Sequence, residues 1–357
     1  MAVNEEINDA ESSDAELTTY RYLRGGMVGV VVLLLATVLY ERLKVDCWQT
    51  SISAYYYTPV RSLFVGGLMA IGLCLIVIKG NTPWEDTALN TAGMLAPVVA
   101  FVPTSGVGAC WSVTPLPPKN DSPVGWLVAN IDNPPTDPTD SELLEAWAAS
   151  NIADDIPARP PADDALAAWV VANIHNNISA LLVVGFIGLA ATAIIVWWTN
   201  RRGAGGVVPD PGSVWDRIKS GKGLGLPIVA VLLVLGFVLF NFWDDFDQRS
   251  HGWAAVAMFA FLALAVALNA HDVRKKTEKR VVFWWYVGIA VSMVVAAVAI
   301  KVLAWQIESW HHETLVLEAV EIVLFAAFWI VQTVDLWGET VRTPTEPAIA
   351  AAGPDTT

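Results

Sequence analysis

The chain has 357 residues, of which 55% are hydrophobic and only 16% charged, and its formal net charge is −14. A soluble domain of this length usually carries about 25% charged residues, so the composition excludes an ordinary soluble protein and indicates several membrane helices. The acidic balance also argues against nucleic acid as a partner, because phosphate binding needs patches of Lys and Arg.

Apolar runs dominate the chain, and each is long enough to cross a hydrocarbon core of about 30 Å, which takes about 20 helical residues. The runs cover residues 25–43, 60–80, 88–111, 175–198, 223–243, 252–270, 281–304 and 315–337. The sequence therefore predicts an all-α integral membrane bundle of about eight transmembrane helices. We expect a multi-pass protein of the cell membrane, with the lipid bilayer as its first partner.

The distribution of Lys and Arg predicts the orientation. Most basic residues fall in segments that are cytoplasmic if both termini are cytoplasmic, as the positive-inside rule requires. The first run lacks a small-residue cleavage site, so we interpret it as a retained helix. The predicted segments are an acidic cytoplasmic tail (1–24), three helices (25–111), an extracytoplasmic segment (112–174), five helices (175–337) and a cytoplasmic tail (338–357).

The predicted outer segment, residues 112–174, is acidic, rich in Pro and Asp, and contains a repeat. The pattern W-x-x-x-N-I begins at Trp126, Trp147 and Trp169, and residues typical of helix starts precede each copy. The repeat predicts three short helices that present Trp and Ile on one face. One interpretation is that they fold back and cap the bundle. The other is a docking surface for a membrane or envelope protein, because exposed Trp is a favoured interface anchor.

Two cysteines, Cys47 and Cys110, fall at the predicted outer ends of helices, in a compartment where disulfides persist. A Cys47–Cys110 bridge and two unrelated thiols are both open interpretations. The third cysteine, Cys74, lies within a predicted helix and is typical of core packing.

Proline and glycine residues predict how two of the helices are shaped and packed. Pro97 and Pro103 are expected to kink the helix over 88–111. Gly66, Gly67 and Gly72 allow another helix to approach the helix over 60–80 closely.

Polar residues at membrane depth are costly, and they gather in residues 51–61, 244–251 and 308–321, all at the predicted outer face. Glu318 and Glu321 lie three residues apart and therefore share a helix face, which we expect to point into the bundle or a wet cavity. At the cytoplasmic end of the same helix, Gln332 and Asp335 are expected to pair with basic loops.

These outer-face residues suggest a metal-binding or proton-handling site. The candidate catalytic residues are Ser53, His251 and Glu318. The candidate ligands for zinc, the one cofactor that the sequence suggests, are His251, His311, His312 and Asp247. Their spacing matches no HExxH-type signature. The alternative is a set of interfacial histidines, with buried carboxylates paired to Arg61 and Lys301. His175, at the start of the run 175–198, is expected to be a solvated cap.

One motif carries a family resemblance. The run S-x-S-x-Y-Y-Y-T-x-x-R-x-x-F-V-G from Ser51 to Gly66 resembles a group of uncharacterised bacterial polytopic membrane proteins, which implies a shared fold but no established activity. A more distant similarity is to the alkaline ceramidase and adiponectin-receptor group. That similarity implies a zinc-dependent hydrolase with Ser53, Asp247, His251 and His312 as site residues, although the His-x-x-x-His pair of that group is absent here.

Three functions follow from these observations. The first, which we prefer because no catalytic signature is complete, is a scaffold or accessory subunit that docks partners through residues 112–174. The second is a membrane-embedded hydrolase that acts on a lipid at the outer leaflet. The third is a transporter that uses Glu318 and Glu321, ranked last because the hydrophobic segments show no inverted repeat.

Overall fold

The computed structural model describes residues 2–104, 162–201, 225–274, 276–307 and 310–339, and this part of the chain is helical with no strand. The α-helices are α1 (Ala2–Val45), α2 (Arg61–Val77), α3 (Pro83–Phe101), α6 (Ala162–Arg201), α8 (Gly225–Phe242), α9 (Phe246–Val273), α10 (Arg280–Gln306) and α11 (Glu313–Asp335). Two short 3₁₀ helices are η1 (Ser53–Tyr57) and η2 (Thr277–Lys279).

Within the described residues, six helices are long and apolar enough to cross a membrane: α1, α6, α8, α9, α10 and α11. The predicted all-α membrane bundle is therefore confirmed. The predicted number of eight spans is not, because α2 has only 17 residues and α3 is not among the six. Glu85 and Asp86 in the first turn of α3 make that helix less apolar.

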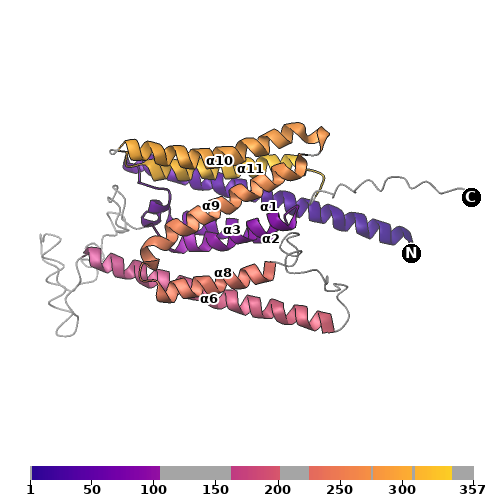
Figure 1. Ribbon diagram of the computed structural model, residues 1–357, viewed down its shortest axis with the longest axis horizontal. Helices are drawn as coiled ribbons and strands as arrows, with labels where there is room; N and C mark the ends of the chain where they lie inside the picture. The colour runs from indigo at the N-terminus through magenta and orange to yellow at the C-terminus, as the bar shows by residue number, and fades with distance from the viewer. Residues whose placement is uncertain (1, 105–161, 202–224, 275, 308–309, 340–357) are drawn as a thin grey trace, which may run out of the picture.

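The helices form one bundle with a pair of helices beside it (Figure 1). In the bundle, α9 packs against α3 on one side and α10 on the other, and α11 packs between α10 and α1. The pair α6 and α8 lies against α3. Every apolar helix leaves much of its surface exposed, which suits a lipid environment.

The start of α1 and the end of α11 lie at the same end of the bundle (Figure 1). Arg21 donates through Nε to the carbonyl oxygen of Trp337 at 2.9 Å, and its guanidinium lies 4.6 Å from that indole ring. Lys279 forms an ion pair with Asp335 at 2.8 Å, as we expected for Asp335 and a basic loop. Following the predicted orientation, we name this the cytoplasmic end and the opposite one the outer end.

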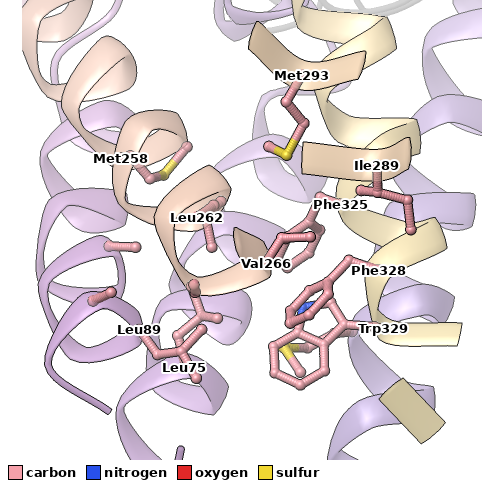
Figure 2. Close-up of a cluster of buried hydrophobic side chains, with 14 of the residues drawn as sticks. Leu75, Leu89, Met258, Leu262, Val266, Ile289, Met293, Phe325, Phe328 and Trp329 are labelled. Atoms are coloured by element: carbon pink, nitrogen blue, oxygen red, sulfur yellow. The ribbon is translucent and has the colours of Figure 1, made fainter. Parts of the chain in front are cut away.

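Large side chains fill the centre of the bundle (Figure 2). Trp329 is fully buried and lies 4.9 Å from the ring of Phe328, while Leu262 and Met293 approach from α9 and α10. Lipid tails are as apolar as these residues, so close packing and buried polar contacts, more than the hydrophobic effect, must hold membrane helices together.

Helices α2 and α3 touch backbone to backbone where Gly72 faces Gly93. A Cβ atom on Gly72 would lie 2.8 Å from the carbonyl oxygen of Gly93, and one on Gly93 would lie 2.7 Å from that of Gly72. The predicted close approach is thus confirmed for Gly72. A Cβ atom on Gly67 would contact the Val30 side chain of α1, whereas one on Gly66 would meet open space.

The ends of α3 follow from its sequence. Thr82 caps the start, its Oγ1 accepting from the Glu85 N–H at 3.2 Å, and Pro83 occupies the first turn. The helix ends at Phe101, well before the predicted residue 111. Pro97 lies inside it, but the predicted kink at Pro103 is wrong, because the helix has already ended. Pro103 has no N–H to continue the helical hydrogen bonding.

The third W-x-x-x-N-I copy, which starts at Trp169, is not a separate short helix. It forms the first part of the 40-residue helix α6, whose candidate span is Val170–Thr199. No Pro or Gly interrupts residues 162–184, so nothing separates this copy from the spanning helix. The first two copies, at Trp126 and Trp147, lie outside the described residues.

A fully buried carboxylate, that of Glu85, joins three helices near the cytoplasmic end. It accepts hydrogen bonds from Asn269 Nδ2 of α9 at 2.8 Å and from Gln332 Nε2 of α11 at 3.2 Å. The Asn81 backbone N–H and Nδ2 also donate to it, at 2.8 and 3.2 Å. Gln332 therefore contacts this carboxylate and not a basic loop as predicted, because a buried acid needs hydrogen-bond donors more than a solvated loop does.

The Glu85 contacts can be tested by the substitution Glu85→Ala. It removes a buried acceptor that Asn81, Asn269 and Gln332 share, and the loss of a buried hydrogen-bond partner costs about 1–3 kcal/mol. We expect the free energy of unfolding to fall by at least ~2 kcal/mol, measured by denaturant unfolding in mixed micelles. The control is Glu278→Ala, an exposed position in η2. Equal effects of the two substitutions would contradict the assigned role.

Candidate functional site

The candidate site begins with a buried segment between α1 and α2. Residues 51–56 are at most 2% exposed, although they include backbone that belongs to no long helix. Buried N–H groups must be hydrogen-bonded, so this segment needs acceptors from elsewhere in the chain.

Glu318 of α11 supplies those acceptors. Its Oε2 accepts from the backbone N–H groups of Ile52 at 2.6 Å and Ser53 at 3.2 Å, and its Oε1 accepts from Ser53 Oγ at 3.0 Å. Lys301 of α10 attracts the same carboxylate electrostatically. Two of the predicted catalytic residues, Ser53 and Glu318, are thus in direct contact.

A second hydroxyl continues this contact toward the outer end. Ser51 Oγ lies 3.1 Å from Ser53 Oγ and accepts from the Ala54 N–H at 2.9 Å. The sequence analysis did not select Ser51, although the S-x-S pattern was the available signal. The result is a line of polar groups formed by Ser51, Ser53 and Glu318.

A small cavity lies on the inner side of this line, in the middle of the bundle. We call it the core cavity; its volume is about 60 Å³. Of its described lining residues, Ser53 and Glu318 are polar and the rest are apolar. The apolar lining comes from α1, α2, α3, α9 and α11 and includes Phe64, Met258 and Phe325.

A second cavity lies on the outer side of the same line. This outer-end cavity has a volume of about 380 Å³ and is lined mainly by polar groups. They come from the segment before η1, from Thr104 beyond α3, from Trp310 and His311 in the connection between α10 and α11, and from Glu313 at the start of α11. Ser51 lines this cavity and Ser53 lines the core cavity, so the two serines stand between an apolar and a polar space.

Two tyrosines of η1, Tyr56 and Tyr57, hold the segment in place through hydrogen bonds of their hydroxyl groups. Burial raises the pKa of Tyr57 to about 12; the neighbouring Tyr56 adds to the rise and Arg61 opposes it. Burial also raises the pKa of Tyr56 above its usual value. These phenols are therefore hydrogen-bonding groups at neutral pH, not bases. Tyr57 donates to the Thr104 carbonyl at 3.2 Å, and Tyr56 accepts from Arg61 at 2.8 Å.

His251, a predicted catalytic residue and zinc ligand, contacts the end of α3. Its Nδ1 lies 2.6 Å from the Val102 carbonyl and 3.1 Å from the Val99 carbonyl, so this nitrogen carries the proton and donates. The Val99 carbonyl would normally accept from residue 103, but Pro103 has no N–H. His251 replaces that donor from a different helix. Its Nε2 is buried without a hydrogen-bond partner among the described residues.

The other predicted zinc ligands lie in separate contacts. His312 Nδ1 is 3.2 Å from the Gln49 carbonyl, His311 lines the outer-end cavity, and Asp247 lies 3.4 Å from His175 of α6. Among the residues that the structure describes, no three His, Cys, Asp or Glu side chains come together to hold a metal ion. Zinc binding therefore stays a prediction. His175 lies inside α6 and contacts Asp247, so it does not open its helix as a cap.

Cys47 is disulfide-bonded and Cys74 is a free thiol. Cys110, the predicted partner of Cys47, lies outside the described residues, as do Trp126 and Trp147. The Cys47–Cys110 pairing and the docking surface of the outer segment therefore stay predictions.

The role of His251 can be tested by two substitutions. In His251→Ala the carbonyls of Val99 and Val102 lose a buried donor, so we expect the free energy of unfolding to fall by about 1–3 kcal/mol. In His251→Asn an amide N–H can replace Nδ1, and we expect most of that loss to be recovered. Thermal unfolding of the detergent-solubilised protein measures both. Equal loss of stability in the two variants would contradict the capping role.

Searches of protein-family models, curated proteins and solved structures found no match to this chain. The resemblances in the Ser51–Gly66 motif therefore stay predictions. The function has to be argued from the site itself.

Proposed function

We propose that this membrane protein binds an amphiphile at its outer end, with an alkyl group in the core cavity and a hydrogen-bond-donating polar group in the outer-end cavity. The observation that carries the proposal is the position of Ser51 and Ser53. Their hydroxyls are 3.1 Å apart, and one lines a polar space while the other lines an apolar one. A molecule with an apolar part and a polar part would fit an apolar cavity beside Ser53 and a polar cavity beside Ser51.

The size of the core cavity limits its occupant. Empty apolar space costs about 24 cal/mol per Å³, so a cavity of about 60 Å³ costs roughly 1.4 kcal/mol, which an alkyl group would recover. An apolar cavity of about 150 Å³ can hold benzene. The core cavity therefore suits a few methylene groups, and the flexible side chain of Met258 can yield to admit more.

The chemistry of the polar lining favours ligands that donate hydrogen bonds. Glu318 and Glu313 are acceptors when ionised, and Thr50 and Ser51 add hydroxyl groups. Trp310 also lines the outer-end cavity, and an aromatic ring can bind an ammonium group through its face. A lipid with an ethanolamine headgroup has the required ammonium donor and alkyl chains.

Lipid photolabelling tests this proposal. The probe is a phosphatidylethanolamine that carries a photoreactive diazirine near the end of one acyl chain, mixed into vesicles with the reconstituted protein. We expect labelling of core-cavity residues, with a loss of at least ~5-fold in Met258→Trp, because the larger side chain fills the space. The control is Val256→Trp on the exposed face of α9, where Val256 is 66% exposed.

In the control variant, Val256→Trp, the probe should label core-cavity residues to the same extent as in the unchanged protein. Equal labelling of the cavity in the Met258→Trp and Val256→Trp variants would contradict the proposal, provided that both unfold at the same temperature as the unchanged protein.

A second candidate function, hydrolysis of a lipid ester, is favoured by the hydrogen bond from Ser53 Oγ to Glu318. Ser53 Oγ would attack the ester carbonyl carbon while its proton passes to Glu318. The alcohol would then leave with that proton, and water would release the acyl group from Ser53 by the reverse steps. Both Glu318 oxygens already accept hydrogen bonds, from the Ile52 and Ser53 N–H groups and from Ser53 Oγ.

A fluorophosphonate probe distinguishes hydrolysis from simple binding, because it forms a bond only with an activated serine. If the second candidate is right, the probe labels Ser53, and Glu318→Gln lowers the labelling rate by about 10²-fold or more. Ser62, an exposed serine on α2, serves as the internal control. Labelling of neither serine in folded protein would exclude hydrolysis through Ser53 and leave amphiphile binding as the function.

A further inference from the structure

A buried acid on α11, Glu321, differs from the other buried acids of the bundle. Its side chain is only 4% exposed, and neither carboxylate oxygen has a hydrogen-bond partner among the described residues. It lies within the candidate span Glu313–Asp335. With a rise of 1.5 Å per residue, it is roughly 12 Å below the outer start of that helix.

Three other acids in the bundle each have hydrogen-bond donors or a basic partner. Glu85 accepts four hydrogen bonds from amide groups, and Glu318 accepts three from the Ile52 and Ser53 groups. Asp335 pairs with Lys279 and accepts from Tyr286 at 3.1 Å. Each of these carboxylates is compensated, whereas Glu321 is not.

The helices packed against α11 offer Glu321 no counter-charge. On α10, Lys301 attracts Glu318, and Tyr286 bonds to Asp335. On α9, His251 donates to carbonyls of α3. On α1 the buried charged residues are Arg24 and Glu41, and neither contacts the Glu321 carboxylate.

An isolated carboxylate in apolar surroundings is so unfavourable that it takes up a proton instead. A neutral carboxyl group is therefore the form that fits this position. Glu318 lies three residues away, so the two side chains are neighbours on the helix surface. From Glu318, polar groups continue through Ser53 and Ser51 to the outer-end cavity.

We propose that Glu321 is a proton-binding site inside the membrane span, loaded from the outer-end cavity through Ser51, Ser53 and Glu318. The ligand is the proton, and the site is occupied in this conformation. The proposal does not depend on amphiphile binding, because it rests on Glu321 and not on the core cavity. It gives the chain a chemical role that suits proton-coupled membrane proteins.

Chemical modification tests the occupancy of the site. Dicyclohexylcarbodiimide is an apolar reagent that adds to protonated carboxyl groups. At neutral pH we expect it to modify Glu321 at least ~10-fold more than Glu318, because the three hydrogen bonds to Glu318 favour its ionised form, whereas neither Glu321 oxygen has a partner among the described residues. Peptide mass spectrometry of the reconstituted protein measures both sites in one sample, and modification of Glu321 should decline as the pH rises.

Infrared spectroscopy provides the second measurement, which does not depend on access of a reagent. We expect the carbonyl band of a protonated carboxyl group in the unchanged protein and in Glu318→Gln, and its loss in Glu321→Gln. The Glu321→Gln variant should also keep its unfolding temperature, since an amide resembles the neutral acid in size and charge. A spectrum in which Glu321→Gln removes only an ionised carboxylate band would overturn the site.

The route is tested by transfer of the protein into D₂O. The shift of the Glu321 carbonyl band reports arrival of deuterium, and we expect it to slow at least ~10-fold in Ser53→Ala. Ser62→Ala, on the exposed face of α2, is the matched control. An unchanged rate in Ser53→Ala would overturn the route.

Discussion

The buried carboxylate of Glu85 is the contact on which the arrangement of the bundle depends. It brings together the start of α3, the cytoplasmic part of α9 and the last turns of α11 through amide donors. A membrane core offers little hydrophobic drive for helices to associate, so directional contacts of this kind decide which helices meet. The Gly72–Gly93 contact then sets how closely α2 approaches α3. These two constraints place four of the five helices that, with η1, line the core cavity.

The polar residues of the outer end divide into two kinds. Glu318 and His251 both satisfy backbone groups that the chain cannot pair locally, in η1 and at the end of α3. Ser53 and Ser51 belong to the same network, but Ser53 also lines the core cavity and Ser51 the outer-end cavity. Structural and chemical roles therefore overlap in the same few side chains. This overlap explains why stability and ligand binding have to be measured side by side in any variant of this region.

Much of the fold could be predicted because long apolar runs directly indicate membrane helices, as they do for α8 and α10. The contact between Ser53 and Glu318 was accessible for a similar reason: a polar residue inside a span must face the bundle. The Glu85 network was not, since Glu85 lies in the first turn of α3, where an acid is typical of an ordinary helix start. His251 was assigned to chemistry because a histidine that caps a helix and one that binds a metal look alike in sequence. The length of α3 was overestimated because an apolar run does not show where Pro103 ends the helix.

The two ends of α3 depend on residues that are made much later. In its first turn, Glu85 accepts hydrogen bonds from Asn269 and Gln332, and at its other end the Val102 carbonyl accepts one from His251. All three donors come from the C-terminal half of the chain. During synthesis, α3 is therefore made with polar groups that do not yet have their final partners. The N-terminal helices must wait for α9 and α11 before they can adopt their native contacts. The order of translation thus makes the arrival of α9 and α11 the step that commits this protein to its fold.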